Sequence, residues 1–77
     1  MNIEEWMNKA RESISGIESG KFFIVKDLFD GYEWNSLPKG DRLSFGRYFK
    51  NAVVNKKVDG VHYAGKLDNN SANYGKD

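Results

Sequence analysis

The chain has 77 residues, a formal net charge of +1, no cysteine and one histidine. A chain of this length forms one domain, here residues 1–77, and such a domain buries only about 60% of the surface that its unfolded chain exposes. Without cysteine, neither disulfides nor thiolate metal sites can supplement the core, so aromatic side chains have to provide much of its area. No apolar stretch approaches the roughly 20 residues that cross a bilayer, and the amino terminus "MNIEEWMNKA" does not resemble a signal peptide, so we expect a soluble, cytoplasmic protein.

The small net charge hides an uneven distribution along the chain. Residues 1–36 carry four Lys or Arg against seven Asp or Glu (4 − 7 = −3), whereas residues 37–66 carry seven against two (7 − 2 = +5). Residues 67–77 carry one against two (1 − 2 = −1). This separation predicts a basic surface that faces one partner and an acidic surface elsewhere.

An amphipathic helix is predicted near the N-terminus, because apolar residues recur there at helical spacing. These residues are Ile3, Trp6, Met7, Ala10, Ile14 and Ile17. Asn2 is placed to cap this helix, with Glu5 three residues later as in a capping box. Gly16 and Gly20 mark the positions where the helix ends.

The next segment contains a short strand and a brief helix. "KFFIV" (residues 21–25) is β-branched and aromatic, which favours a strand. "VKDLFDG" (residues 25–31) predicts a brief helix that Gly31 closes, and "YEWNSLP" (residues 32–38) predicts a connection. Two apolar side chains are expected to anchor this connection to the core, Trp34 and Leu37.

A long helix follows in "PKGDRLSFGRYFKNAVVNKK", beginning either with Pro38 at its first position or with a cap at Gly40-Asp41. At about 100° per residue, one side of this helix gathers apolar and small residues and the opposite side gathers polar ones. The first set is Phe45, Gly46, Phe49, Ala52 and Val53, and the second is Ser44, Arg47, Asn51 and Asn55. Glycine inside a helix costs about 1 kcal/mol relative to alanine, so Gly46 predicts close approach of another backbone.

The last part of the chain predicts two short strands. Residues 61–64 alternate, the turn-rich "LDNNS" follows, and Ala72 and Tyr74 lie in the second strand. The predicted order is helix, strand, short helix, long helix and hairpin. This order is that of an α+β winged helix-turn-helix domain, with the long helix as third helix and the hairpin as wing.

The sequence offers little for catalysis. One histidine and no cysteine exclude a plausible zinc cluster, and His62 has no serine or carboxylate at a recognised spacing. Gly40 and Gly46 do not form a phosphate loop, because no Gly-Lys-Ser/Thr follows them. We therefore expect a protein that is not an enzyme and that needs no cofactor or metal.

Nucleic-acid binding has a physical basis in the long helix. In the major groove, Arg recognises guanine, Asn recognises adenine and Ser recognises either, and the row Ser44, Arg47, Asn51 offers all three types. Lys and Arg side chains that flank this row would contact DNA phosphates, and residues of the wing would provide further hydrogen-bond donors. The complete predicted set is Lys39, Arg42, Ser44, Arg47, Lys50, Asn51, Lys56, Lys57, Lys66 and Asn70. Tyr48 and Tyr63 are ambiguous between the edge of the core and base stacking.

The chain also resembles a known family. The pattern that carries the resemblance covers about residues 21–75 and comprises Phe23, Val25-Lys26-Asp27-Leu28-Phe29, Trp34, Leu37, Arg42, Gly46, Phe49, Val53 and Tyr74. It is similar to a small family, catalogued as a domain of unknown function, from phages, plasmids and other mobile elements of Gram-positive bacteria. The resemblance implies a winged-helix-like fold and, for some members, DNA binding beside replication enzymes, single strands included. Only Arg42 belongs both to this pattern and to the predicted binding set.

Two hypotheses from different classes follow. The first is a non-catalytic DNA-binding protein, either a regulator on duplex DNA or a replication accessory on single strands beside a polymerase, primase or helicase. A regulator needs a two-fold dimer for palindromic sites, and the first helix with Trp6 and Met7 could supply that interface. The alternative is a protein-interaction module that docks on a larger enzyme without contacting nucleic acid.

Overall fold

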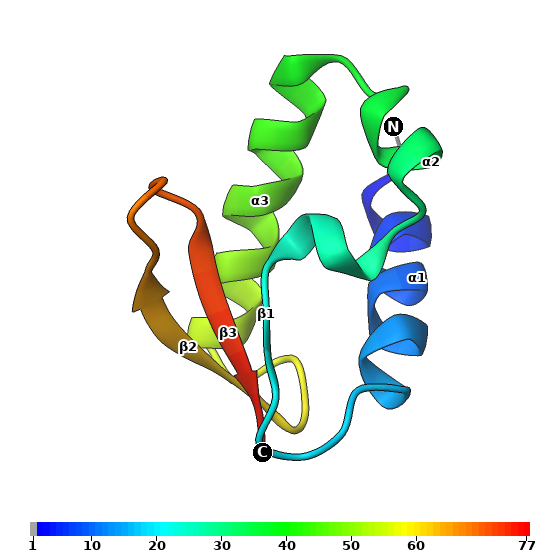
Figure 1. Ribbon diagram of the computed structural model, residues 1–77. Coiled ribbons are helices and arrows are strands. Elements are labelled where there is room, and N and C mark those ends of the chain that lie inside the picture. The colour runs from blue at the N-terminus through cyan, green and yellow to red at the C-terminus, as the bar shows by residue number, and fades with distance from the viewer. Residues whose placement is uncertain (1) are drawn as a thin grey trace.

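Three α-helices and a three-stranded antiparallel sheet make up residues 2–77, the part of the chain that this computed structural model describes. The elements are α1 (Ile3–Ser15), β1 (Phe22–Phe23), the 3₁₀ helix η1 (Val25–Leu28), α2 (Gly31–Asn35), α3 (Lys39–Val54), β2 (Val61–Lys66) and β3 (Ala72–Lys76). Figure 1 shows α1 and α3 running alongside each other, with the sheet next to α3. The predicted α+β class is therefore confirmed.

The last strand forms the centre of the sheet, whose order is β1-β3-β2. Phe23 pairs with Tyr74 on one side of β3, and Tyr63 pairs with Tyr74 on the other. The β2–β3 register shifts between Tyr63 and Lys66, where Gly65 has a φ of 91° that favours glycine. The predicted strands are confirmed, and their pairing brings the residues that follow β1 next to the hairpin.

The ends of α1 are held by specific side chains. Asn2 Oδ1 accepts a hydrogen bond from the Glu5 backbone N–H at 3.1 Å, as its predicted capping role requires. Gly16 is the C-cap, and α1 has no basic residue in its last turn. Lys76 of β3 supplies that charge, because its Nζ donates to the Ile14 carbonyl at 2.6 Å. This contact also ties the first helix to the last strand.

The segment between β1 and α3 differs from the prediction. The brief helix is the 3₁₀ turn η1, and Gly31 does not close it but begins α2, which occupies part of the predicted connection. The physical reason is Asp30, whose Oδ1 accepts from the Tyr32 backbone N–H at 2.8 Å and so caps a new helix. Trp34 and Leu37 do pack against the core, which confirms their predicted anchoring role.

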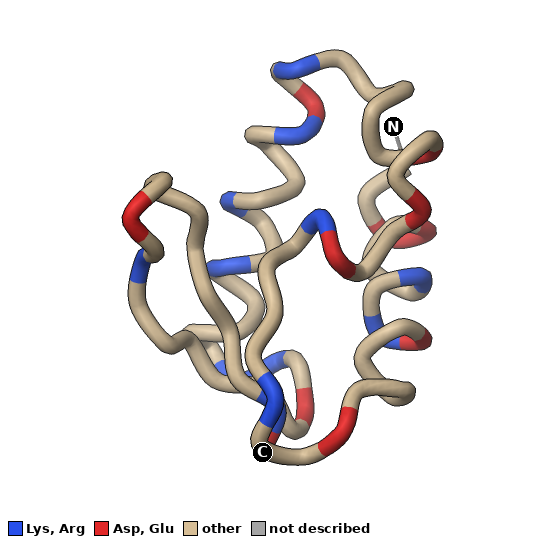
Figure 2. The backbone as a smooth tube through the Cα atoms, viewed as in Figure 1, with Lys and Arg blue, Asp and Glu red and all other residues tan. Residues whose placement is uncertain are grey.

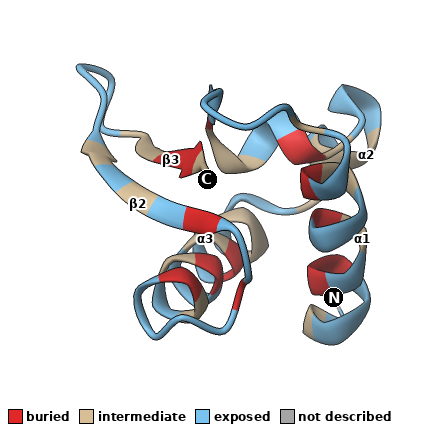
Figure 3. Cartoon of the chain, turned by 90° about the horizontal axis from the view of Figure 1, so that it is seen from below, coloured by how far each residue is buried: buried red, intermediate tan, exposed pale blue. Residues whose placement is uncertain are grey.

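The long helix α3 begins at Lys39 with Pro38 as its N-cap, so the predicted start is correct to within one residue. Its buried residues are Phe45, Phe49 and Val53. Figure 3 shows buried segments on α1 and α3, whereas the tip of the β2–β3 hairpin is exposed. The aromatic core holds Trp6 against Phe29, with ring centroids 4.7 Å apart, and Phe49 against Tyr74, with centroids 4.9 Å apart.

The predicted dimer surface on α1 is wrong as regards its two anchor residues. Trp6 is 8% exposed and Met7 is 3% exposed, because both side chains belong to the core. In so small a domain, these large apolar groups are needed to bury the interior. Within residues 2–77, the helices are also too short or too polar to cross a membrane.

Candidate nucleic-acid interface

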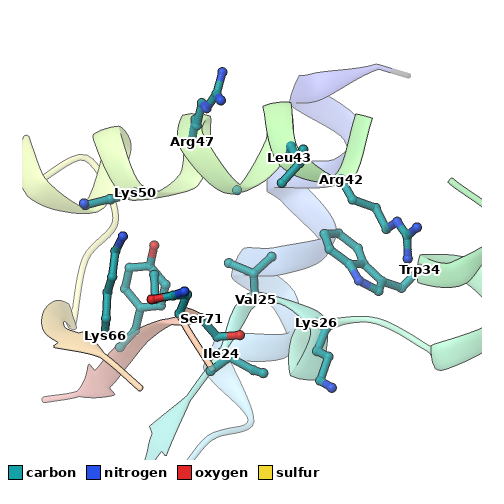
Figure 4. A pocket seen from close by; sticks show the side chains of 14 residues that line it. Ile24, Val25, Lys26, Trp34, Arg42, Leu43, Arg47, Lys50, Lys66 and Ser71 are labelled. Carbon is teal, nitrogen blue, oxygen red and sulfur yellow. The ribbon is translucent and has the colours of Figure 1, made fainter. Parts of the chain in front are cut away.

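A groove of about 450 Å³ lies between α3 and the β2–β3 hairpin, with η1 and α2 contributing to its lining (Figure 4). Five of its described lining residues are basic and none is acidic. The basic residues are Lys26, Arg42, Arg47, Lys50 and Lys66. Such a cluster, without carboxylates to neutralise it, creates a positive potential along the groove. We refer to this feature as the basic groove.

The cationic side chains of the basic groove point in different directions. In Figure 4, Lys66 from β2 extends toward α3, and Lys50 from α3 lies at the same end of the groove. Arg42 lies beside Trp34 at the other end, while Arg47 and Lys26 point away from the groove. The hairpin end therefore concentrates two ammonium groups, and the opposite end combines a guanidinium with an aromatic ring.

Between these ends, the basic groove is apolar. Its described apolar side chains are Ile24, Val25, Trp34, Leu43 and Ala72. Leu43 is 54% exposed although it is a large aliphatic residue. Apolar surface next to convergent charges is typical of a binding site, since such surface gains free energy when a ligand removes it from water.

Two buried polar groups of residues that line the groove have no hydrogen-bond partner within residues 2–77. They are the Tyr74 hydroxyl and Arg42 Nε. Burial raises the pKa of Tyr74 from 10.0 to about 12, and the neighbouring Tyr63 adds to this rise. A buried donor without a partner costs about 1–3 kcal/mol, so both groups would gain from an acceptor in the groove.

Tyr63 contacts Lys50 of the groove lining but does not itself line the groove. The Lys50 Nζ lies 4.7 Å from the centroid of the Tyr63 ring, which places an ammonium group over an aromatic face. Tyr63 is partly buried and packs edge-on against Tyr74, with ring centroids 5.8 Å apart. Tyr63 therefore lies at the edge of the core, whereas Tyr48 is 46% exposed and does not line the groove.

The outward row predicted on α3 is present as an exposed surface. Ser44, Arg47 and Asn51 are all exposed. Arg47 also lines the basic groove, so the row and the groove meet along one side of the helix. Figure 2 shows Lys and Arg recurring along α3 next to the hairpin.

The ten predicted binding residues do not form one cluster. The groove brings together five of them, Arg42, Arg47, Lys50, Lys66 and Asn70. Ser44 and Asn51 lie on the exposed row, and Lys39 is in the first turn of α3. Lys56 and Lys57 follow the helix, and Lys56 lines a separate cavity with Asp59 and Asp77, whose charges oppose its own.

Sequence reasoning missed several residues of the groove. Lys26, Trp34 and Tyr74 line it, although none was in the predicted set. No local pattern marks Lys26, which lies in the acidic half of the chain. For Tyr74, the signal was a hydroxyl carried on a core-facing position of a strand, where such a group needs a partner.

The predicted reason for Gly46 is wrong. A Cβ built at this position would have no described atom within 4 Å, so no second backbone approaches it. Gly46 instead lines the basic groove. Its missing side chain leaves space in the groove.

His62 lies on the exposed surface of β2, as expected, but it does have a carboxylate partner. Its Nδ1 lies 2.5 Å from Asp77 Oδ1 near the C-terminus. Its ring also lies over Gly75, where a Cβ would come within 2.5 Å of two ring atoms. Within residues 2–77, no three His, Asp or Glu side chains are grouped to hold a metal ion.

Comparisons with known proteins give one finding about ancestry. No curated protein and no solved structure matches the chain significantly. A family model described as "Domain of unknown function (DUF1413)" matches residues 8–76, which include all the described lining of the basic groove. The chain therefore belongs to the DUF1413 family.

Proposed function

We propose that this protein binds DNA without catalysing a reaction, through the basic groove and the exposed row on α3. The observation that carries this proposal is the presence of five basic and no acidic residues among the described lining of the groove. The sugar–phosphate backbone of a nucleic acid is the partner that such a surface attracts most strongly, because each neutralised phosphate releases condensed counterions.

The arrangement of the elements supports a winged helix-turn-helix interpretation. The three residues 36–38 join α2 to α3, which is a turn length typical of helix-turn-helix motifs. The β2–β3 hairpin would be the wing, and β1 pairs with β3 beside it. In this interpretation α3 is the recognition helix, and Ser44, Arg47 and Asn51 are available for base edges.

The burial of α1 favours one biological version of the proposal. A regulator that reads palindromic duplex sites needs a two-fold dimer, but Trp6 and Met7 are buried in the core of the monomer. We therefore favour a replication accessory of a mobile element, working beside a polymerase, primase or helicase. A helicase or polymerase gene next to the native gene would support this version, and a divergent promoter would favour a regulator.

A salt titration tests the proposal. The affinity for labelled oligonucleotides should fall as salt rises, with a log–log slope of about −0.7 per phosphate contact on single strands and −0.9 on duplex DNA. The double variant Lys50→Gln, Lys66→Gln should lose about 1.4 from the magnitude of the single-strand slope, since it removes two contacts. Absence of salt-dependent binding to either form would contradict the proposal.

A matched control removes the same charge elsewhere. Arg11 lies exposed on α1 and Lys21 precedes β1, and neither lines the basic groove. The double variant Arg11→Gln, Lys21→Gln should keep the wild-type slope. An equal loss of slope in both double variants would mean that net charge, and not the groove, controls binding.

The apolar lining of the groove favours one second candidate, a protein-interaction module with an acidic partner. Under this alternative, Arg47→Glu combined with Lys50→Glu would abolish capture of a partner from cells that carry the native gene neighbourhood. Nucleic-acid affinity would not change. Capture that disappears after nuclease treatment would instead indicate a nucleic-acid bridge.

A further inference from the structure

The two ends of the basic groove differ in chemistry. Lys50 and Lys66 both lie at the hairpin end, which suits a phosphate because two ammonium groups can share its charge. Trp34 and Leu43 line the region toward the other end, where Arg42 lies beside the indole. This region suits a flat, partly apolar group that carries hydrogen-bond acceptors.

The apolar lining distinguishes single-stranded from duplex nucleic acid. A duplex presents phosphates and the edges of its grooves, while its base faces are stacked on each other and unavailable. A single strand can instead place a base face on an aromatic or aliphatic side chain. The exposed Leu43 and the half-buried Trp34 would gain from a base but gain little from a hydrated duplex backbone.

The unpaired donors point in the same direction. Tyr74 is 0% exposed and its hydroxyl has no partner within residues 2–77, yet the residue belongs to the lining of the groove. Arg42 Nε, near Trp34, is likewise a buried donor with no hydrogen-bond partner within residues 2–77. Phosphate oxygens and base carbonyls are acceptors for such groups, and a strand lying in the groove brings both kinds.

We propose that the basic groove binds single-stranded nucleic acid, with a backbone phosphate between Lys50 and Lys66 and a base packed against Trp34 and Leu43. This inference rests on the proposed function and narrows it to single-stranded nucleic acid bound at one site. The volume of about 450 Å³ lies within the range of small-ligand pockets, so the groove holds a short segment of a strand.

The first experiment uses Tyr74→Phe, which removes the unpaired hydroxyl and keeps the ring. Binding is measured by fluorescence anisotropy with a labelled oligothymidylate of about 12 nucleotides, within the site sizes of single-strand binders. The affinity should fall about tenfold, because a charge-assisted hydrogen bond is lost. The melting temperature should stay equal or rise, since an unpaired buried group is removed.

Tyr48→Phe is the matched control, because Tyr48 is exposed on α3 and does not line the groove. It should leave both affinity and stability unchanged. A weaker affinity together with an unchanged or higher melting temperature in Tyr74→Phe cannot come from damage to the fold. Unchanged affinity in Tyr74→Phe would overturn the assigned role of the hydroxyl and count against the groove.

The second experiment fills the groove from Gly46. Gly46→Leu should lower the oligothymidylate affinity at least tenfold relative to Gly46→Ala, because the larger side chain occupies the space that a base needs. Circular dichroism should show that both variants remain helical, since both residues favour a helix more than glycine does. Equal single-strand affinity in the two variants would overturn the inference.

The outcomes separate this inference from the proposed function. Arg47→Ala combined with Asn51→Ala removes two residues of the exposed row. In one outcome, this double variant no longer binds a duplex of the same length, and wild type and Gly46→Leu bind single strands equally. The proposed DNA binding then stands, and the inference about the groove fails. If wild type binds neither form, both fail. If wild type prefers the single strand to the duplex and Gly46→Leu loses this preference, the result supports both the proposed function and the inference about the groove.

Discussion

Two adjacent faces of α3 differ in burial and in charge. On the core face, Phe45 and Phe49 are fully buried. Phe45 makes a ring contact with Trp6 of α1, and Phe49 makes one with Tyr74 of β3. On the adjacent face, α3 presents Arg42, Lys50 and the bare backbone of Gly46 to the basic groove. The core face supplies the apolar burial that stabilises a domain of this size, and the groove face keeps partly exposed charge and apolar surface that contribute little to folding. We infer that stability and ligand binding are assigned to adjacent faces of one helix.

The distribution of charge sharpens the same contrast. Figure 2 shows acidic residues on α1 and α2, although α1 also carries Lys9 and Arg11, while basic residues recur along α3. On the acidic side, Lys9 is paired with Glu33 at 3.3 Å and lies near the Trp6 ring. A polyanion would therefore be attracted to the groove more strongly than to α1.

The largest expected effect on stability comes from creating a cavity in the core. Phe45→Ala should lower the free energy of unfolding by about 3–5 kcal/mol, because it removes a fully buried ring from the aromatic cluster. Small domains have little stability to lose, so much of the protein should be unfolded at 37 °C, an ordinary assay temperature. Thermal denaturation followed by circular dichroism measures this loss. Tyr48→Ala, at an exposed position of the same helix, is the control. A similar loss in both variants would contradict the assignment of Phe45 to the stabilising core.

The next largest effect depends on pH and on Tyr74. The folded pKa of about 12 lies above the ordinary value of 10.0, chiefly because burial disfavours the phenolate. Stability from this group is complete below pH 10 and is lost as the pH rises through 12, by about 3 kcal/mol in total at 1.36 kcal/mol per unit. Urea unfolding of wild type and Tyr74→Phe at pH 9, 10.5 and 12, conditions that bracket the shift, should show this loss only in wild type.

The smallest effect has the opposite sign. Gly46→Ala should raise the free energy of unfolding by up to about 1 kcal/mol, because alanine favours a helix and its Cβ meets no described atom. Differential scanning calorimetry detects this rise. A fall in melting temperature would restore the prediction that another backbone packs closely against Gly46.

Most of the elements could be predicted because each carries its own periodic pattern. The spacing of apolar residues gives α1 and α3, and alternation gives the hairpin. The exception is α2, where Gly31 suggested a helix end. Asp30 with Glu33 three residues later is the pattern of a capping box, so a helix start was also visible there.

The groove could be predicted only in part. Its residues on α3 are close in sequence, and the charge count identified them. Lys26 and Trp34 reach the same groove because β1 pairs with β3 and α2 packs on the core, which no local pattern reveals. The unpaired state of Tyr74 depends on the complete set of its neighbours, so it becomes visible only in three dimensions.

The most direct test of this division is a titration of ¹⁵N-labelled protein with oligothymidylate, followed by amide chemical shifts. The largest changes should occur in residues 24–26, 42–50 and 66–74, which surround the basic groove. Residues 3–15 of α1 should remain unchanged. Changes centred on α1, or none at saturating oligonucleotide, would contradict the account.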